Sequence, residues 1–299
     1  MLRRQLFGDI AGRWQVKEVT GDIHPGSMAA ASVVEGQSGN QKLYLFGGDS
    51  GIGRFTNALS TLSTSGKFQR LHPTGEVPSE RREHRGFAFE GKVHFIGGFT
   101  RQLDRLRQED FMEKSELSRY YFTNDIYRLD PRDISFTRVS TSGARLPPRS
   151  GFGIALLDQR LFVHGGINNQ PLNDFFVLDL KSLEWTEILE TGLSTPLSNQ
   201  TLTRATDTEI MLVGGNRKIS DTESKISNKV KIYDVGKSEW RDEAPLPTEF
   251  GGADGGLLLH ETVEMRCGSS VCLLSLGGFV DKKQGSAHPS HIAVFEIVS

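Results

Sequence analysis

The sequence predicts an all-β fold, a β-propeller, and three observations carry this prediction. An apolar stretch runs repeatedly into two adjacent glycines. A strand that ends near an aspartate is repeatedly followed, six positions later, by an aromatic residue. The glycine pairs recur about 50 to 70 residues apart, and repeats of this length are typical of propellers and arrays. The chain has 299 residues, enough for one large β domain.

The apolar stretches are predicted to be the second strands of the repeats. Their residues are apolar, or nearly so, on both faces, which is typical of strands buried on both sides. The stretches are KLYLFGG (42–48), KVHFIGG (92–98), RLFVHGG (160–166), EIMLVGG (209–215) and CLLSLGG (272–278). The glycine pairs are Gly47 and Gly48, Gly97 and Gly98, Gly165 and Gly166, Gly214 and Gly215, and Gly277 and Gly278.

The aspartate and aromatic positions predict a hairpin of third and fourth strands in each repeat. Turn-forming residues such as Pro131 and Gly236 separate the two positions. The first repeat lacks the aspartate, and Phe68 holds its aromatic position. The complete pairs are Asp130 with Phe136, Asp179 with Trp185, and Asp234 with Trp240.

On these motifs the chain resembles the kelch family of β-propellers from about Arg13 to Ser299. The family repeat has a double glycine after an apolar strand, then a tyrosine region and then a tryptophan. The resemblance implies that an aromatic residue of the fourth strand packs against the glycine backbone, where a Cβ would hold it away. We expect an N-terminal tail at 1–12 and one propeller domain at 13–299.

The two ends of the chain are predicted to close the propeller. The last repeat ends at IAVFEIVS (292–299) without an aromatic strand, whereas RWQVKEV (13–19) has no neighbouring repeat of its own. We expect Trp14 to complete the last blade, because closure removes exposed sheet edges. This predicts five blades, with six as the alternative.

The stretch 99–123 is predicted to be a long loop insert. Leucines and charged residues recur in it at helical intervals, so we expect a helical turn or two. Three roles stay open for it, which are a cap over the central channel, a partner-binding lobe and simple decoration.

Composition and charge narrow the function and the location. The 35 basic and 37 acidic residues give a net charge of −2, which argues against a dedicated nucleic-acid binder. No apolar run is long enough to span a membrane, and the N-terminus lacks the apolar core of a secretory signal. We expect a cytoplasmic protein, with the nucleus as an alternative. The early arginines leave a mitochondrial presequence as a further alternative.

No catalytic or metal-binding motif is evident. A Gly-x-Ser-x-Gly elbow and a phosphate-binding loop are both absent from the sequence. His288 and His291 have a ligand-like spacing, but the sequence places no further ligand beside them. Cys267 and Cys272 flank a short turn, where they could face each other or be buried thiols. We predict no cofactor, no metal and no enzymatic activity.

Candidate binding residues lie in the loops, where recognition on rigid scaffolds usually takes place. The resemblance implies that Arg81, Arg82 and Arg149 point toward the mouth of the central channel and hold acidic side chains or a peptide carboxylate. The alternative is that these arginines tie adjacent blades together through backbone carbonyls. Further candidates that follow glycine pairs are Arg54, Arg101, Asn168, Asn169, Arg217 and Lys218.

The expected function is a non-enzymatic module that binds a peptide or protein through this loop-lined face. The resemblance implies a substrate receptor or scaffold for a ubiquitin ligase, or a cytoskeletal protein, although no BTB or F-box segment accompanies the repeats. The alternative is a small-molecule lyase, epimerase or oxidase at the channel mouth. The sequence places no cluster of acidic, histidine or tyrosine residues near Arg81 and Arg149. We expect no nucleic-acid or membrane partner, and the oligomeric state is not predicted.

Overall fold

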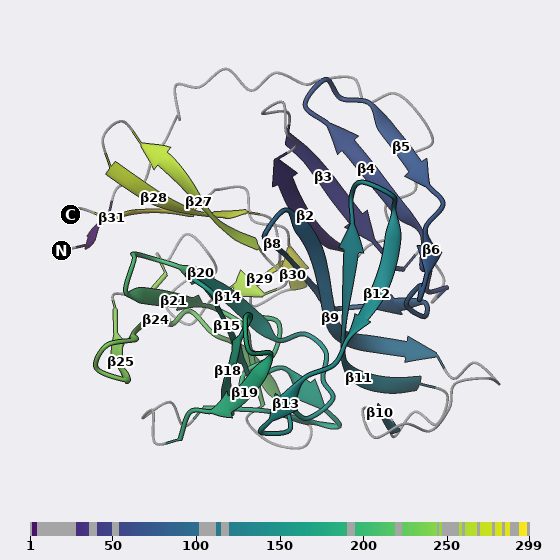
Figure 1. Ribbon diagram of the computed structural model, residues 1–299. Coiled ribbons are helices and arrows are strands. Elements are labelled where there is room, and N and C mark those ends of the chain that lie inside the picture. Colours follow the sequence, from purple (N-terminus) through teal and green to yellow (C-terminus); the bar gives the residue numbers. More distant parts are fainter. Residues whose placement is uncertain are drawn as a thin grey trace. The chain divides into compact units, whose positions relative to one another are not determined.

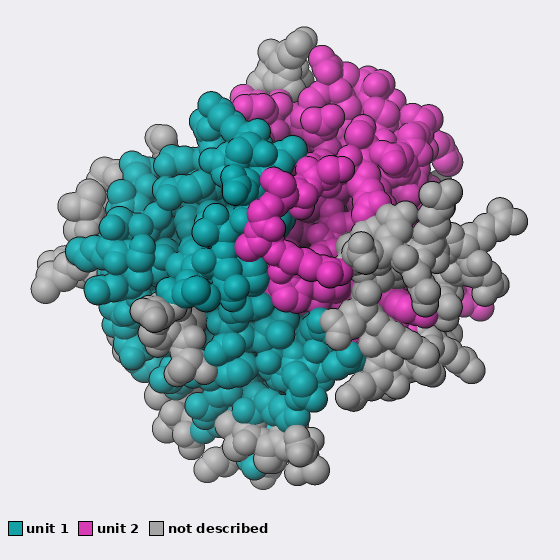
Figure 2. Space-filling model, turned by 60° about the horizontal axis from the view of Figure 1, so that its bottom comes forward, with its two compact units in different colours: residues 1–13, 151–299 teal, residues 14–150 magenta. Residues whose placement is uncertain are grey.

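The computed structural model is all-β in the residues that it describes (Figure 1). These residues are 2–4, 28–35, 41–49, 54–101, 112–114, 120–189, 195–218, 223–243, 245–246, 257–258, 261–267, 270–276, 279–282, 285–287 and 293–297. The chain divides into two compact units (Figure 2). Unit 1 comprises residues 1–13 and 151–299, and unit 2 comprises residues 14–150.

Unit 2 contains two antiparallel four-stranded arrays. The first has the order β2 (Ala30–Glu35), β3 (Gln41–Phe46), β4 (Leu59–Ser63) and β5 (Phe68–Leu71). The second has the order β8 (Arg85–Phe89), β9 (Lys92–Arg101), β11 (Tyr120–Asp130) and β12 (Ser135–Val139). Short strands extend the second array, with β6 (Thr74–Gly75) on β12, β7 (Arg81–Arg82) on β9 and β10 (Met112–Lys114) on β11. After β12 the chain forms β13 (Ser142–Gly143).

Unit 1 contains three such arrays. The first has the order β14 (Gly153–Leu157), β15 (Arg160–His164), β18 (Phe175–Asp179) and β19 (Glu184–Glu187). The second has the order β20 (Thr201–Arg204), β21 (Glu209–Val213), β24 (Val230–Asp234) and β25 (Glu239–Asp242). The third has the order β27 (Glu261–Cys267), β28 (Ser270–Leu276), β31 (Ala293–Ile297) and β1 (Leu2–Arg4). Smaller ribbons are β16 (Ile167–Asn168) with β17 (Gln170–Pro171), β22 (Asn216–Lys218) with β23 (Ser224–Ile226), and β29 (Phe279–Lys282) between β26 (Leu257–Leu258) and β30 (Gly285–Ala287). Five arrays therefore follow one plan within the described residues, and the number of blades stays a prediction.

The predicted second strands and the hairpins that follow them are confirmed in the described arrays. In unit 2, Phe46 of β3 and Phe95 of β9 are fully buried and lie 5.0 Å apart between ring centroids. Phe136 of β12 packs against Phe46 at 5.4 Å. Strands buried on both faces have no polar side to show in the sequence, which explains the unbroken apolar runs.

The aspartates of the repeated hairpins cap their turns. The Asp179 carboxylate accepts the backbone N–H groups of Lys181 and Ser182 at 2.9 and 2.8 Å, and Asp234 accepts those of Gly236 and Lys237, both at 3.0 Å. An aspartate that bonds the backbone two or three residues ahead fixes a tight turn. The carboxylates thus hold the register that brings each fourth strand back onto the third.

The prediction of what packs against the glycine pairs is wrong in the described repeats. A Cβ on Gly47 would lie 2.6 Å from the Arg81 carbonyl oxygen and 2.8 Å from the His84 ring. On Gly98 it would meet the Arg82 carbonyl oxygen and His84 Cβ, both at 2.8 Å. The neighbour is therefore the segment that enters a first strand. The fourth-strand aromatic residues Phe136 and Trp185 are instead buried, at 2% and 4% exposure, and Phe136 packs on the Phe46 side chain of the other array.

The N-terminal strand that completes the last array is β1, so the prediction that residues 13–19 do so is corrected. Leu2, Arg3 and Arg4 pair antiparallel with Ile297, Glu296 and Phe295 of β31, and the two ends of the chain lie side by side (Figure 1). An open strand edge accepts any extended segment with free backbone groups, so the aromatic pattern of residues 13–19 did not identify the segment that pairs with β31. The predicted strand itself, with Trp14, lies outside the described residues.

The insert at 99–123 is also corrected where the structure describes it. Its ends are strands, because β9 continues to Arg101 and β11 begins at Tyr120, with Tyr120 paired to Arg101. β10 then pairs with β11, Met112 opposite Thr123. Phe99 lies opposite Phe122 in the first of these pairings, so the two ends of the insert form a strand pair. Most of the expected helical segment lies outside the described residues.

Three further predictions fall on the C-terminal part of the chain. The β27–β28 hairpin pairs Cys272 with Met265 and Cys267 with Ser270, so the two cysteines are not opposite each other. Gly277, Gly278, His288 and His291 lie outside the described residues.

Candidate binding surfaces

Arg81, a predicted partner-binding residue, is an interior residue of unit 2. Its side chain is 1% exposed. The guanidinium makes a forked ion pair with Asp125, with Nη1–Oδ1 and Nη2–Oδ2 distances of 2.5 and 3.1 Å. Nη1 also donates to the Gly97 carbonyl at 3.1 Å. A buried arginine that is neutralised by a carboxylate cannot reach a partner without leaving that carboxylate uncompensated. The burial and ion pairing of Arg81 therefore argue against its predicted role in partner binding.

Arg149 is buried as well. It is 0% exposed, and its Nε donates to the Pro147 carbonyl at 3.0 Å, which argues against its predicted role in partner binding. The backbone carbonyls at Arg81, at Arg149 and at one further position accept hydrogen bonds from the second glycine of three of the pairs. Gly48 N–H donates to the Arg81 carbonyl at 2.8 Å, Gly98 to Arg149 at 2.9 Å and Gly166 to Leu197 at 2.8 Å. The third link has a leucine in the arginine position, so the link depends on the backbone.

His84 is a buried residue of the segment that enters β8 and packs against the glycine pairs. The residue is 2% exposed, and its ring lies against Phe46 and Phe95, with centroid distances of 5.6 and 5.9 Å. Burial, with Arg81 and Arg85 nearby, lowers the pKa of His84 well below its ordinary value. A neutral imidazole is the form that this apolar site can hold. The histidine is therefore part of the glycine-pair packing.

Arg82 and Arg101 belong to a partly exposed cluster in unit 2, which we name the arginine–aromatic cluster. Arg82 Cζ lies 4.8 Å from the Phe55 ring centroid and 5.7 Å from that of Phe99. Arg101 Cζ lies 5.6 Å from the Phe55 centroid. Tyr120 stacks on Phe99 at 5.0 Å. The members are Phe55, Arg82, Phe99, Arg101 and Tyr120.

The cluster is preorganised by strand register and by an ion pair. β7 and β9 place Arg82 opposite Phe99, and Arg82 Nη1 lies 3.1 Å from Asp49 Oδ2. The Arg82 side chain keeps 27% of its surface exposed, whereas Phe55 and Phe99 are buried. A guanidinium stacked on aromatic rings can still bond oxygen acceptors through its edge. The arrangement can therefore present the exposed parts of two stacked guanidinium groups to a partner.

The remaining predicted binding residues are divided between the units. Arg54 is exposed in unit 2, next to Phe55. In unit 1, Asn168 and Asn169 lie at the tip of the β16–β17 ribbon, where Asn169 has a φ of 54°. Lys218 Nζ donates to Gln170 Oε1 at 3.0 Å, which ties the tip of that ribbon to β22.

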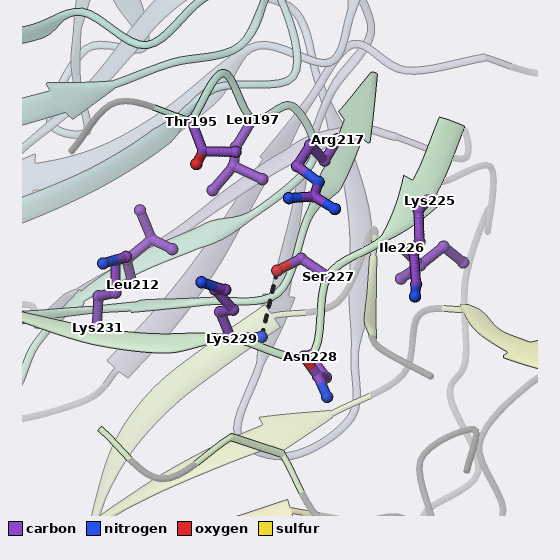
Figure 3. A pocket seen from close by; sticks show the side chains of 10 residues that line it. All are labelled: Thr195, Leu197, Leu212, Arg217, Lys225, Ile226, Ser227, Asn228, Lys229 and Lys231. Carbon is purple, nitrogen blue, oxygen red and sulfur yellow. Dashed lines mark hydrogen bonds between the residues drawn. The ribbon is translucent and has the colours of Figure 1, made fainter. Parts of the chain in front are cut away.

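Arg217 lines a pocket of about 220 Å³ in unit 1 (Figure 3). β21 to β24 and the segment before β20 supply its walls. Three lysines that the sequence reasoning missed join Arg217 there, namely Lys225, Lys229 and Lys231. The sequence contains a signal for this site, because the three lysines fall within SKISNKVKI (224–232) with no acidic residue between them. We name this site the basic pocket.

Two features are absent from the residues that the structure describes. No group of three or more His, Cys, Asp or Glu residues in this part of the chain is arranged to hold a metal ion. In the same residues, no helix has the length and apolar character needed to cross a membrane.

A family model described as KLHDC2/KLHL20/DRC7 Kelch-repeats domain matches residues 9–215 and 113–255. Among curated proteins, the chain is 24% identical over 264 residues to Host cell factor of Drosophila melanogaster, covering 79% of this chain and 16% of that protein. It is 24% identical over 291 residues to Kelch domain-containing protein 2 of Bos taurus, covering 85% of this chain and 68% of that protein. It is 28% identical over 170 residues to Tip elongation aberrant protein 3 of Schizosaccharomyces pombe, covering 50% and 15% respectively.

Among solved structures, the chain is similar to the one titled "Structure of YjhT". The TM-score is 0.65 at 16% sequence identity, covering 89% of this chain and 83% of that chain. This likeness shows the fold, which is that of a β-propeller, as the sequence predicts.

Proposed function

Because the chain belongs to the Kelch-repeat family, we propose that it is a protein-interaction module that binds a peptide or protein partner through its loops. The observation that carries this proposal is the arginine–aromatic cluster. Arginine and aromatic residues dominate the binding energy of protein interfaces because they combine a large contact area with directed hydrogen bonds. Here two arginines are held over the Phe55 ring beside the ends of β7 and β9.

The chemistry of the cluster favours a partner with oxygen acceptors. Each planar guanidinium can donate paired hydrogen bonds to a carboxylate or to backbone carbonyls. Stacking on rings holds the side chains in place, so less conformational entropy is lost on binding. The Asp49 and Glu83 carboxylates already lie beside Arg82, at 3.1 Å from Nη1 and 3.5 Å from Nε, and the partner would contact the exposed surface that remains on the cluster.

A finer form of the proposal is that the protein acts as a substrate receptor or scaffold for a ubiquitin ligase. The kelch resemblance of the glycine and aromatic repeats supports it. Reconstitution with purified ligase scaffold subunits tests this form separately, since a binding module without such a role would still bind its peptide.

The test begins with a displayed random-peptide library selected on the immobilised protein. Affinities of the recovered peptides are then measured by calorimetry for the wild type and for Arg82→Ala/Arg101→Ala. We expect a loss of about tenfold or more, the size of a hot-spot contribution. Arg132→Ala is the matched control, because Arg132 is a 78% exposed arginine paired with Asp130 at the far end of β11. It should leave the affinities unchanged.

Thermal melting of each variant separates loss of binding from loss of folding. The proposal is overturned if the library yields no peptide that binds the wild type. It is also overturned if the double variant folds and binds the recovered peptides as tightly as the wild type does.

A further inference from the structure

Ser227 lies at the wall of the basic pocket, in the loop that joins β23 to β24. The loop consists of Ser227, Asn228 and Lys229, all of which line the pocket. Ser227 is partly exposed and Lys229 is exposed. Figure 3 shows Ser227 directed toward the same space as Arg217 and Lys229. A hydroxyl in this position can react with an agent that approaches from solvent.

Hydrogen bonds of the backbone fix the position of this hydroxyl. The Ser227 N–H donates to the Gly215 carbonyl at 2.7 Å, which continues the pairing of β22 with β23. The Lys229 N–H donates to Ser227 Oγ at 3.2 Å. A serine oxygen that accepts a backbone N–H two residues ahead forms a local turn. An ester oxygen can still accept this bond, so a phosphoryl group on Ser227 is compatible with the turn.

The residues around Ser227 have a charge pattern that suits the substrate groove of a kinase with acidic residues. Lys225 precedes the serine by two positions and Lys229 follows it by two, and the stretch 224–232 contains no acidic residue. In an extended chain, side chains two positions apart point to the same side, so both lysines would flank the hydroxyl. An acidic groove attracts such a segment by charge complementarity. The pattern therefore favours a serine kinase directed to basic residues.

A kinase must draw this segment into its groove, and the ribbon beside it is short. β23 pairs with β22 over residues 224–226. Short elements of this kind open locally at a lower free energy than the whole unit unfolds. The segment can therefore become extended while the remainder of unit 1 stays folded.

We propose that Ser227 is a phosphorylation site for a serine kinase directed to basic residues, and that Arg217 holds the phosphate in the basic pocket. In the reaction, Ser227 Oγ bonds the γ-phosphorus of ATP, the bond from that phosphorus to the bridging oxygen breaks, and ADP leaves. The hydroxyl proton passes to the catalytic base of the kinase. The phosphate brings nearly two negative charges at neutral pH into a pocket lined by basic side chains. Phosphorylation thus changes the charge of this surface of unit 1.

Arg217 is assigned to the phosphate because of its place on β22. It lies opposite Lys225, and the hydrogen bond from Ser227 to Gly215 continues that pairing. Arg217 is therefore a diagonal neighbour of Ser227 across two strands, and long side chains reach such neighbours. A guanidinium can donate paired hydrogen bonds to phosphate oxygens.

Two lysines of the pocket already act on a carboxylate. Lys231 Nζ lies 2.6 Å from Asp242 Oδ1. Hydrogen bonding from Lys231, together with the charges of Lys231 and Lys229, lowers the pKa of the Asp242 carboxyl. A phosphate on Ser227 would share these lysines with Asp242, so its main contact is expected to be Arg217.

The first experiment incubates the full chain with ATP and the catalytic domain of protein kinase C, and peptide mass spectrometry locates the phosphate. We expect Ser227 to be the main site. Ser65 is the internal control, because it is more exposed than Ser227 and has Lys67 two positions later, but Ser63 instead of a lysine two positions earlier. Ser227 should be modified about tenfold or more faster than Ser65, since a second lysine adds to the attraction by the kinase.

Variants test the charge pattern. Lys229→Ala should slow the modification of Ser227 by about tenfold, because it removes the exposed lysine that follows the serine. Lys237→Ala is the matched control, since it removes an exposed lysine from a turn of the same unit, outside the pocket lining. It should leave the rate unchanged. Melting curves verify that both variants fold.

Phosphorus NMR of the phosphorylated chain tests the role of Arg217 by measuring the second pKa of the phosphoserine. A nearby guanidinium favours the dianion, so this pKa should lie below its ordinary value of about 6. Arg217→Ala should raise the pKa by about 0.5 or more relative to the phosphorylated wild type. Lys181→Ala, in a turn outside the pocket lining, should leave it unchanged.

The two parts of the proposal can fail separately. The phosphorylation site is overturned if the kinase modifies a synthetic peptide of residues 223–233 but not Ser227 of the folded chain, if it modifies neither, or if Ser65 is modified as fast. The role of Arg217 is overturned if the folded, phosphorylated Arg217→Ala variant keeps the wild-type pKa. None of these results alters the effect of Arg82→Ala/Arg101→Ala on library peptides, so the proposed function stands or fails independently.

Discussion

Gly47 shows at the residue scale why a buried apolar strand ends in two glycines. Its φ is +69°, and a Cβ there would lie 2.6 Å from the Arg81 carbonyl oxygen. The adjacent Gly48 N–H bonds that same carbonyl. The pair thus turns the chain and also lets another backbone segment approach to hydrogen-bonding distance. Neither requirement concerns the side chains of the strand, so the apolar run in the sequence could not reveal that a second backbone segment packs against the glycines.

Gly47→Ala should destabilise the protein more than Gly91→Ala. Both glycines have positive φ, at +69° and +70°, but a Cβ on Gly91 has nothing within 4 Å. Gly91→Ala should cost about 1 kcal/mol from backbone strain alone, whereas Gly47→Ala adds a steric clash of about 1–3 kcal/mol. Chemical denaturation measures both. Equal losses would show that the close approach of Arg81 contributes nothing.

His94 offers a pH-dependent test of burial within β9. It is 7% exposed and stacks on Phe87 at 4.8 Å with an interplanar angle of 10°. Burial, and then Arg128, lowers the pKa of His94 from 6.5 to about 4. The unfolded chain therefore binds more protons than the folded chain between these values. Stability is full above pH 6.5 and falls as the pH drops toward 4, by up to about 3 kcal/mol.

His94→Phe keeps an aromatic ring and removes this titration. The variant should lose less stability than the wild type between pH 6.5 and 4.5, by about 2 kcal/mol. His84 is unchanged and retains its own contribution in the same direction. Denaturation at each pH measures the effect, and parallel profiles for the wild type and the variant would refute the assignment.

At the scale of elements, the plan of the arrays follows from the repeats, whereas the edge strand β1 does not. The four-strand pattern recurs because each apolar second strand must be covered on both faces and paired on both edges. The strand at the end of the last array pairs through its backbone, and β1 contributes only three residues to it. Short pairings of this kind leave little pattern in a sequence.

Removal of residues 1–4 should destabilise the last array of unit 1. Loss of β1 exposes the backbone groups of β31 and removes a few hydrogen bonds, for about 1–3 kcal/mol, and the open edge should promote aggregation. The control, Leu2→Ala/Arg3→Ala/Arg4→Ala, keeps the backbone pairing and should be less affected. Thermal melting and light scattering measure the two effects. A truncated chain that melts like the wild type and stays monodisperse would contradict the role of β1.

At the scale of the whole molecule, both units use the same link between a glycine pair and the segment that enters a first strand. The link recurs at Gly48, Gly98 and Gly166 although the acceptor residue changes from arginine to leucine. Because this repeated hydrogen bond is made by backbone atoms, the loops beside it can vary in length and chemistry without loss of the fold. The arginine–aromatic cluster and the basic pocket are two such variations, built on unit 2 and unit 1 respectively.

The sequence by itself determined the all-β class, the second strands and the aspartate hairpins, because burial periodicity and turn chemistry are local. It could also point to loops as the place of recognition. Tertiary structure decided which arginines are available. Arg81 and Arg149 look like Arg82 and Arg101 in sequence, but only long-range partners such as Asp125 show that Arg81 is buried and neutralised. The same holds for the basic pocket, because cations from three strands and a loop meet only when these elements fold together.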